Sequence, residues 1–398
     1  MIYFYISTII FIAGILIVYW IHSQYHLDIV AKPAPPPPDG PLISVCVPAR
    51  NEERNIRDCV EAILAQDYPN FEVIVLEDRS TDATAGILRG LLMESDSLLS
   101  HSKDQAPSLQ IIPGADLPTG WAGKPHALVQ AAGAARGEWL CFVDADTFLS
   151  PATLSACYTK ALETKADMFT IMTFQVMGTF WEKAVLPIVM TSLSLAFSPR
   201  KVNDPQHKAA VANGQFILVR RAVYDAIGGH ERIKDQIVED KAISELVKWN
   251  GYRLVMADGY SLARTRMYTS LPEMWEGWTK NVYLGLREQP SLMLLGAFGA
   301  FLLLVAALVL PLWPVLGTFW YLQGGGGLAL TVILQSLVLW SIVIYVRGRV
   351  AAGMGISPWY AFTLPLGAGV FAAMMITSTW KVLSGQGVSW KGRRYTPK

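Results

Sequence analysis

Four long runs of apolar residues stand out along the chain. The first covers residues 1–21 and contains no charged side chain. Three more lie in the C-terminal third, at about 291–313, 326–346 and 359–380. Each run is close to the ~20 residues that a helix needs to cross the hydrocarbon core of a bilayer. The pattern therefore predicts a membrane protein with helices at both ends of the chain.

Between these runs, the pattern changes to short β-prone segments that alternate with amphipathic helices. After the first such segment, the apolar positions Ile56, Val60, Ile63 and Leu64 recur at helical spacing. Strands that alternate with helices are typical of a parallel sheet with helices on both faces. The sequence therefore predicts an α/β fold with a doubly wound, mostly parallel sheet, in addition to the transmembrane helices. The strands expected in its first half are "ISVCV" (43–47), "VIVL" (73–76), "LQIIPG" (109–114) and "EWLCFVD" (138–144).

These patterns divide the chain into parts with different surroundings. The stretch "KPAPPPPDGP" (32–41) is rich in proline and predicts an extended, semi-rigid spacer. The run 180–198 is apolar but short and contains Pro187, so we expect an interfacial or buried helix rather than a span. The expected parts are an N-terminal transmembrane anchor (1–22), a linker (23–41), a cytoplasmic α/β domain (42–285), a C-terminal transmembrane region with two or three segments (286–383) and a basic tail (384–398).

Basic residues near the ends of the runs indicate which side of the membrane each part faces. No charged residue precedes the first run and Lys32 follows it, which places the α/β domain in the cytoplasm. The loop 313–327 has no Lys or Arg and suits the outside, whereas "VRGRV" (346–350) suits the inside. The basic tail conflicts with a fourth full crossing, so either the run with Pro365 is re-entrant or another run does not cross. We expect a multi-pass protein of the plasma membrane.

Composition agrees with a membrane protein. The chain has 398 residues, of which 16% are charged, compared with about 25% in soluble proteins. A net charge of +1 gives no indication of nucleic-acid binding, so we expect no nucleic-acid partner. The four cysteines show no C-x-x-C spacing, and Cys46 and Cys141 fall in expected strands, which fits a reduced, cytoplasmic setting. The sequence leaves the oligomeric state open.

Charged residues gather where three of the expected strands end. Arg50 follows the first strand, Asp78 the second, and Asp144 and Asp146 the fourth. In a doubly wound sheet, ligands bind outside the carboxyl ends of the strands. Two carboxylates spaced i, i+2 can hold one hard divalent cation, which would neutralise phosphate oxygens. A solvated turn and a proton-sharing pair are the alternatives for such a motif.

A second acidic pair, Glu239 and Asp240, falls in the first turn of the helix expected for "IVEDKAISELVKW". The N-terminus of a helix stabilises carboxylates, so charge–dipole complementarity alone accounts for such a pair. A carboxylate in this position is also suited to take a proton from a hydroxyl group. The pair therefore has a structural and a catalytic interpretation.

Taken together, these motifs make residues of about 42–285 resemble the family 2 inverting glycosyltransferases. The nucleotide-sugar domain of that family is a doubly wound sheet of the glycosyltransferase A type. The matching segments occur in the family's order along the chain. They are "VPARNEE" (47–53), "LEDRSTDAT" (76–84), "GKPHAL" (123–128), "VDADT" (143–147), "NGQFILVRRAVYDAIGGHE" (213–231) and "VEDKAISELVKWNGYR" (238–253).

The resemblance implies a role for each matching residue. A sugar transfer by single displacement needs one group to take the acceptor's proton and another to stabilise the departing phosphate. Asp240, oriented by Glu239, would be the general base, and Asp144 and Asp146 would hold Mg²⁺ or Mn²⁺. The residues implied on the nucleotide side are Pro48, Arg50, Glu52, Asp78, Lys124 and Asp144, and those on the acceptor side are Gly214 and Gln215.

One departure from the family concerns the region after the base. Processive members carry a Q-x-x-R-W segment there, whereas this chain reads "RTRMYTSLPEMWEGWTKN" (264–281). Trp278 could stack on a sugar or on the acceptor, and Lys280 could reach a phosphate. An amphipathic helix at the membrane surface, where Trp and Lys are enriched, is the alternative. The missing motif argues against a processive polysaccharide synthase.

Four further segments resemble a membrane-bound subgroup that comprises hopanoid-associated, carotenoid and ceramide glycosyltransferases, whose acceptors are lipids. They are "LPTGWAGKPHAL" (117–128), "VNDPQHKAAVANGQF" (202–216), "RMYTSL" (266–271) and "WKGRRY" (390–395). We therefore expect a metal-dependent hexosyltransferase that moves a sugar from a nucleotide diphosphate sugar, carried on UDP, to a lipid hydroxyl in the bilayer. The alternatives are a processive polysaccharide synthase and a non-catalytic membrane scaffold or binding module. The sugar and the lipid stay open.

Overall fold

The computed structural model describes residues 2–24, 28–99, 107–286, 290–390 and 393–395. These residues form two compact units, each built from separate stretches of the chain. The α/β unit consists of His26–Val176 and Phe197–Met267. The helical unit consists of Met1–Tyr25, Met177–Ala196 and Tyr268–Lys398.

A seven-stranded sheet forms the centre of the α/β unit, with the strand order β3-β2-β1-β4-β8-β6-β9. Neighbouring strands are parallel except for β8, which is antiparallel to both β4 and β6. A small second sheet has the order β5-β10-β7. The strands are β1 (Ile43–Ala49), β2 (Phe71–Glu77), β3 (Ser108–Pro113), β4 (Trp139–Val143), β5 (Thr147–Leu149), β6 (Met168–Met172), β7 (Phe174–Gln175), β8 (Phe216–Arg220), β9 (Leu254–Asp258) and β10 (Ala263–Thr265).

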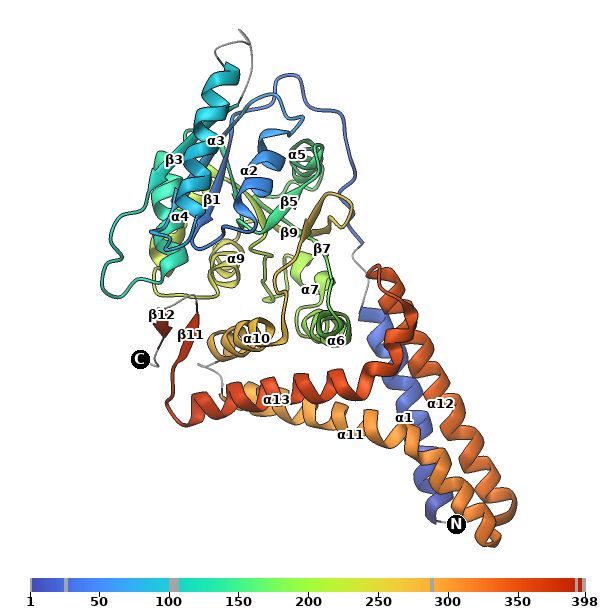
Figure 1. The fold of residues 1–398 in the computed structure, drawn as a ribbon. Coiled ribbons are helices and arrows are strands. Elements are labelled where there is room, and N and C mark those ends of the chain that lie inside the picture. Colours follow the sequence, from blue (N-terminus) through green and yellow to red (C-terminus); the bar gives the residue numbers. More distant parts are fainter. Residues whose placement is uncertain (1, 25–27, 100–106, 287–289, 391–392, 396–398) are drawn as a thin grey trace. The chain divides into compact units, whose positions relative to one another are not determined.

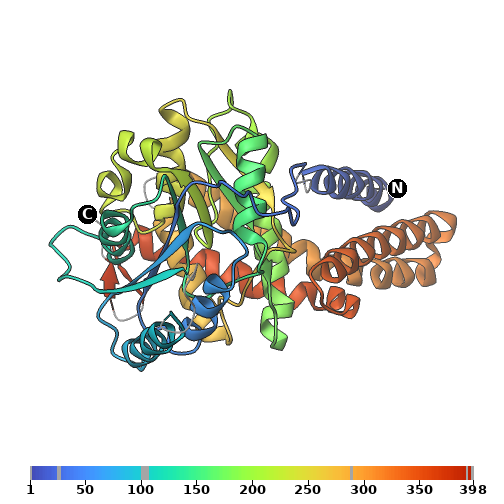
Figure 2. The same ribbon diagram turned by 90° about the horizontal axis from the view of Figure 1, so that it is seen from above.

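Helices cover both faces of this sheet because its strands are apolar on both faces (Figure 1, Figure 2). In β1, Val45 and Val47 pack with α2, α3 and α5, whereas Cys46 between them packs with α4, α8 and α9. This alternation gives the sheet a buried core on each side. The helices are α2 (Ile56–Leu64), α3 (Thr84–Leu99), α4 (Gly123–Ala134), α5 (Thr153–Glu163), α7 (Pro199–Asn203), α8 (Arg221–Ala226), η1 (Gly229–Ile233) and α9 (Glu239–Trp249). The predicted fold class, a doubly wound, mostly parallel sheet, is confirmed.

The helical unit contains the apolar runs. Two stretches, Met293–Gly353 and Pro358–Leu383, are long and apolar enough to cross a membrane, and a shorter apolar stretch, Phe4–Ile17, lies in α1. The elements of this unit are α1 (Ile2–Gln24), α6 (Phe180–Ala196), α10 (Leu271–Leu286), α11 (Pro290–Trp320), η2 (Tyr321–Gly325), α12 (Gly326–Gly353), η3 (Pro358–Thr363), α13 (Leu364–Leu383), β11 (Val388–Trp390) and β12 (Arg393–Tyr395).

The helices α11 and α12 form a hairpin. The chain reverses at η2, where Gly324 (φ 90°) and Gly326 (φ 54°) adopt left-handed backbone angles that glycine accepts readily. Near this turn Gly317 of α11 lies against Ile333 of α12. Beside the hairpin, α12 packs on α1 and η3, whereas α13 packs on α11, α10 and α6. Figure 1 shows α13 beside the first half of α11 and α12 beside its second half.

Two prolines behave differently from their sequence interpretation. Pro187 does not break the apolar run 180–198, because α6 continues through it from Phe180 to Ala196 and packs on α13. A helix is therefore present in this run, and its expected interfacial or buried position stays a prediction. Pro365 does not interrupt the last apolar run either, because it lies in the first turn of α13, where a missing N–H costs no helical hydrogen bond.

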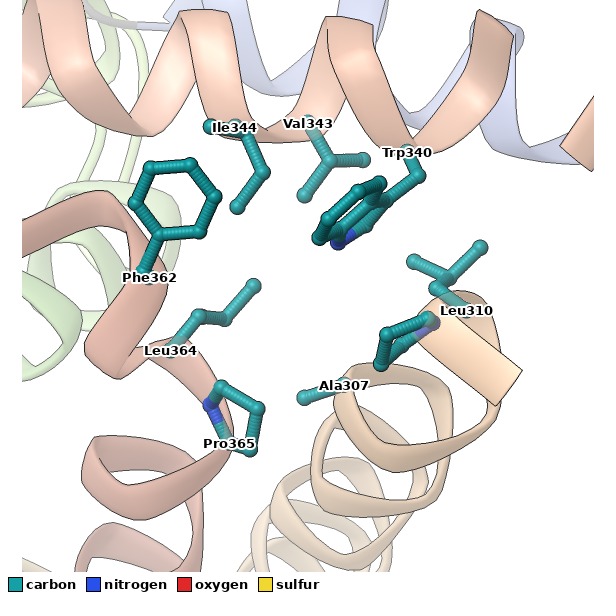
Figure 3. Close-up of a pocket in the computed structure, with 9 residues that line it drawn as sticks. Ala307, Leu310, Trp340, Val343, Ile344, Phe362, Leu364 and Pro365 are labelled. Carbon is teal, nitrogen blue, oxygen red and sulfur yellow. The ribbon is translucent and has the colours of Figure 1, made fainter. Parts of the chain in front are cut away.

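A small apolar cavity of about 80 Å³ lies where α11, α12 and α13 separate. Its lining is mainly apolar. Figure 3 shows the side chains that surround it. They are Ala307, Leu310, Pro311, Trp340, Val343, Ile344, Phe362, Leu364 and Pro365.

Candidate active site

The strand-end residues lie side by side because β2, β1 and β4 are neighbours in the sheet. Arg50 follows β1 directly, and its Nη1 donates a hydrogen bond of 2.6 Å to the carbonyl oxygen of Asp78, which follows β2. The backbone N–H of Asp78 donates in turn to the carbonyl of Ala49 at 2.8 Å. Asp78 is buried, and Pro48 lies within β1 opposite Leu76. The ends of the two strands are therefore held together as one surface.

The loops that continue from these strand ends are also tied to each other. The backbone N–H of Asn51 donates to Ser80 Oγ at 3.1 Å, and that of Glu52 donates to Thr84 Oγ1 at 2.8 Å. Asn51 (φ 53°) and Arg79 (φ 57°) both adopt left-handed backbone angles, which shape the two turns. The two segments that the family resemblance assigns to the nucleotide, 47–53 and 76–84, therefore form one continuous surface. We call this surface the ledge.

Lys124 links two distant segments of the chain. It is the second residue of α4, and its Nζ lies 2.6 Å from Asp144 Oδ1 and 2.6 Å from Glu239 Oε1. Burial alone would lower the pKa of Lys124, but the charges of Asp144, Glu239 and Asp240 outweigh it and hold that pKa well above its ordinary value. The ammonium group is therefore charged and joins the carboxyl end of β4 to the start of α9.

Asp240 lies beside this pair, in the first turn of α9. Its Oδ2 accepts a hydrogen bond from the backbone N–H of Gly214 at 3.2 Å, and its Oδ1 accepts one from the N–H of Lys241 at 2.7 Å. Burial and the neighbouring charge of Glu239 raise the pKa of Asp240 to about 6, although Lys124 opposes them. At neutral pH this carboxylate is ionised yet more basic than an ordinary aspartate.

Gly214 packs directly on the charged groups. A Cβ atom at this position would lie 3.1 Å from Asp240 Oδ2 and 3.3 Å from Lys124 Nζ. Both distances are tighter than ordinary contacts, so a side chain here would displace one of the two groups. The segment before β8, the start of α4 and the start of α9 therefore meet at one point, together with Asp144.

Next to Gly214 lies a polar network that sequence reasoning did not find. The amide oxygen of Gln215 accepts hydrogen bonds from Asn213 Nδ2 and Gln175 Nε2, both at 3.2 Å. The hydroxyl of Thr173 also donates to this oxygen. Gln215 is buried, so its side chain is held within the network. No sequence motif indicates Thr173 or Gln175, because the pairing of strands that are far apart in the sequence brings these residues to Gln215.

The comparison with known proteins identifies the α/β unit. Residues 44–228 match the family model described as Glycosyl transferase family 2. This unit is a family 2 glycosyltransferase domain. The resemblance inferred from the motifs is thereby confirmed, and so is the enzyme class, a glycosyltransferase. Asp78, Lys124, Asp144 and Gly214 lie inside the matched residues, whereas Asp240 lies beyond them and is placed by the contacts described above.

Two curated relatives differ in how much of the chain they match. A 4,4'-diaponeurosporenoate glycosyltransferase of Staphylococcus aureus (strain MRSA252) is 28% identical over 368 residues, which are 89% of this chain and 88% of that protein. The same-named protein of strain USA300 is 26% identical over 248 residues, 61% of each chain. In the first case the similarity extends beyond the α/β unit into the helical unit.

A solved structure shares the fold. The mannosyltransferase PcManGT from Pyrobaculum calidifontis, in complex with GDP-Man and Mn²⁺, aligns with a TM-score of 0.52 and 17% identity. The alignment covers 96% of this chain and 98% of that chain. At this identity the likeness concerns the fold alone, which is that of the glycosyltransferase A type.

The turn after β4 presents the two carboxylates predicted to hold a metal. The carbonyl oxygen of Asp144 accepts from the N–H of Thr147 at 3.0 Å, and that of Asp146 accepts from Thr265 Oγ1 at 3.0 Å. In the part of the chain that the structure describes, no group of three or more His, Cys, Asp or Glu residues forms a complete metal cage. Two carboxylates completed by phosphate oxygens and water are a donor set that Mg²⁺ and Mn²⁺ accept, so the residues fit such an ion.

Trp278 and Lys280 lie in α10, in the helical unit of the glycosyltransferase. The ring of Trp278 is buried, and its centroid lies 6.2 Å from that of Tyr268 in an edge-to-face contact. Tyr268 in turn lies close to Gly277, where a side chain would not fit. The roles predicted for Trp278 and Lys280 toward the acceptor and the phosphate stay predictions.

Proposed function

We propose that this glycosyltransferase moves a sugar from a UDP-linked donor to a hydroxyl group of a membrane lipid, with inversion at the anomeric carbon. The observation that carries the proposal is the cluster around Lys124. This cluster brings Asp144, at the end of β4, together with Glu239 and Asp240, at the start of α9. The donor-side carboxylate of Asp144 then lies close to the carboxylate of Asp240, whose pKa is raised. A single displacement requires two such groups, one at the leaving group and one as the base.

On the donor side, the ledge formed by the β1 and β2 loops supports binding of the nucleotide. Pro48, Arg50 and Glu52 come from the first loop, and Asp78 follows the neighbouring strand. The first turn of α4 carries Lys124 and turns unpaired backbone N–H groups toward its N-terminal side, where phosphate groups bind well. In this proposal the base of the nucleotide lies on the ledge and the diphosphate lies toward Lys124.

Mg²⁺ or Mn²⁺ would be held by Asp144 and Asp146. When bound, such an ion supplies positive charge to the diphosphate oxygens and so stabilises the leaving group. The protein's own contribution is to fix the two carboxylates through the backbone hydrogen bonds of the turn that carries them. Lys124 supplies a second positive charge near the same oxygens.

Asp240 is the general base of the proposed reaction. It takes the proton from the acceptor hydroxyl while that oxygen forms a bond to the anomeric carbon and the bond from that carbon to the diphosphate breaks. Two backbone N–H groups, from Gly214 and Lys241, fix the direction of the carboxylate. Glu239 pairs with Lys124 and thereby keeps that positive charge beside Asp240.

The acceptor is a lipid in this proposal because the relatives act, by their names, on diaponeurosporenoate, a carotenoid-type lipid. The ending of that name denotes a carboxylate, which is already ionised and needs no base. The site of this chain instead gathers Asp144, Glu239 and Asp240 around one ammonium, and this excess of negative charge favours a neutral hydroxyl. Gln215, Trp278 and Lys280 are kept as acceptor-side and phosphate-side candidates.

The helical unit supports an arrangement in the plasma membrane with the α/β unit in the cytoplasm. In this proposal α1, α11 and α12 cross the bilayer, and α13 lies on the cytoplasmic side. The α11–α12 hairpin then places the uncharged turn at η2 outside and Arg349 inside. Because α13 does not cross, the basic tail stays inside, which removes the conflict seen in the sequence.

Replacement of Asp240 by Asn tests the function. We expect the variant to transfer sugar about 10²–10⁴-fold more slowly, the range for loss of a general base, while the Kd for the donor changes little. Glu245→Gln is the matched control, because Glu245 lies on the same helix and pairs with Lys241. Turnover is followed by UDP release with a lipid alcohol and with the matching lipid carboxylate. Normal transfer to the alcohol by the Asn variant would show that Asp240 is not the base.

A further inference from the structure

We propose that Lys124 is an exchangeable counter-ion of the metal site, which neutralises Asp144 before the donor binds and releases it to the metal ion. The inference rests on the proposed metal site at Asp144 and Asp146. It adds that this chain has its own competitor for the metal. It also assigns Lys124 a role in the order of binding, in addition to contact with the nucleotide.

The geometry shows that the ammonium and a metal ion compete for the same atom. Lys124 Nζ lies 2.6 Å from Asp144 Oδ1, which is the distance of a direct charge-assisted hydrogen bond. A divalent ion bound to that oxygen would sit about 2.0–2.2 Å from it. A carboxylate has several lone pairs, but an ammonium and a divalent ion held at the same carboxylate repel each other. This repulsion weakens the contact of the ammonium with Asp144 when the ion binds and favours its departure.

The surrounding carboxylates explain why the lysine is present at all. Asp144 and Glu239 contact Lys124 directly, and Asp240 raises the pKa of Lys124 through its charge. The like charges of these carboxylates repel one another. One ammonium between the carboxylates offsets this repulsion. Without it, the carboxylates alone would attract any divalent ion whether or not a donor is present.

A lysine suits this exchange because its charge sits on a long, flexible stem. Lys124 keeps its second partner, Glu239, when Asp144 turns to the metal. It also stands in the first turn of α4, on the side from which a diphosphate would approach. The negative charge of the diphosphate then replaces Asp144 as a partner of the Lys124 ammonium. Binding of the nucleotide thereby frees Asp144, and metal and nucleotide strengthen each other's binding.

The test measures Mn²⁺ affinity of the full-length protein in nanodiscs by calorimetry, without nucleotide. Lys124→Met and Lys124→Gln remove the charge, and we expect both to bind Mn²⁺ at least about tenfold more tightly than the natural protein. Lys124→Arg keeps the charge and should not gain affinity. Lys241→Met is the matched control, because it removes a neighbouring positive charge that pairs with Glu245 outside the cluster. It should change Mn²⁺ affinity by less than about twofold.

Two further results distinguish an error in the counter-ion role of Lys124 from an error in the proposed metal site. Asp146→Ala should abolish Mn²⁺ binding, and if it does not, the proposed metal site is wrong. If Asp146→Ala abolishes binding but the two neutral Lys124 variants bind Mn²⁺ no more tightly than the natural protein, the site stands and the counter-ion role is overturned. A counter-ion that leaves Asp144 in every catalytic cycle is not needed for folding when metal and UDP are present. Failure of both neutral variants to fold under those conditions also overturns the inference.

Discussion

At the scale of single residues, the carboxyl group of Asp240 lies between opposing influences. Burial and the charge of Glu239 raise its pKa to about 6, and Lys124 opposes them. Because a base acts only when ionised, we expect kcat/KM for a lipid alcohol to fall about tenfold per pH unit below about pH 6 and to level off above it. The measurement is UDP release between about pH 4.5 and 8. A rate that is flat across this range would contradict the assignment.

The same pKa shift gives an independent check on stability. A carboxyl whose pKa is higher in the folded protein than in the unfolded chain, here about 6 against 3.8, costs stability once it ionises. That cost is complete above about pH 6 and disappears below about pH 4, where both states are protonated. Asp240→Asn should therefore raise the thermal midpoint at about pH 8 and leave it unchanged below about pH 4. A loss of stability at the higher pH would show that the hydrogen bonds to the carboxylate outweigh its burial.

Sequence reasoning placed Arg50 and Asp78 at one edge of the sheet because strand ends in a doubly wound sheet meet there. Arg50 and Asp78 follow that rule, and the structure joins them directly. The contact between Lys124 and Glu239 follows no such rule, because no local pattern relates α4 to α9. The network around Gln215 was missed for the same reason. These contacts depend on how distant segments of the chain pack together. Local patterns in a single sequence do not indicate that packing.

At the scale of elements, the packing of α6 on α13 depends on one close approach. A Cβ atom at Gly367 of α13 would fall well inside contact distance of the carbonyl oxygen of Ala184 in α6. We expect Gly367→Ala to destabilise the helical unit by about 1–3 kcal/mol, because backbone on both sides must move apart. Thermal melting in detergent measures the loss. Gly369→Ala is the control on the same helix, since its nearest neighbour, Leu304 Cδ1, lies at 3.7 Å. Equal melting of the two variants would contradict this account.

The elements of the α/β unit were predictable because their periods are clear. Strands β1, β2 and β4 are buried along most of their length, and the helix after β1 keeps its apolar positions on one side. A helix was expected over the run 180–198, and α6 continues through Pro187 although proline ends most helices in isolation. Packing against α13 outweighs that local preference. The reversed direction of β8 was not predictable, since apolar content does not report strand direction.

At the scale of the whole molecule, the proposed topology can be tested by labelling. All four natural cysteines are buried, so a single introduced cysteine provides the reactive thiol. We expect Gln323→Cys, in the turn at η2, to react with a membrane-impermeant maleimide in intact cells. Ser357→Cys and Gln386→Cys should react only after permeabilisation, because α12 returns to the cytoplasm and α13 does not cross. Labelling of Gln386→Cys in intact cells would show that α13 spans the bilayer.

The number of crossings was the part of the architecture that hydropathy could not decide. Both stretches, the hairpin and α13, are long and apolar enough for a span, although the hairpin is the more apolar. Both α12 and α13 pack on α11, but their other partners differ, since α13 packs on α6 and α10, whereas α12 packs on α1. Such a choice of partners is a tertiary property. The positive charge of the tail was the one sequence signal that pointed to it.

The division of the chain between the two units also sets the order in which the protein can assemble on the ribosome. The α/β unit includes Phe197–Met267 and cannot close its sheet until β9, at Leu254–Asp258, has been synthesised. Helix α1 waits longer for its partner, because α12, on which α1 packs, begins only at Gly326. If α1 crosses the bilayer as proposed, it would hold the nascent chain there while the α/β unit folds. The N-terminal helix would then act as a tether in biogenesis before it becomes a partner in the finished helical unit.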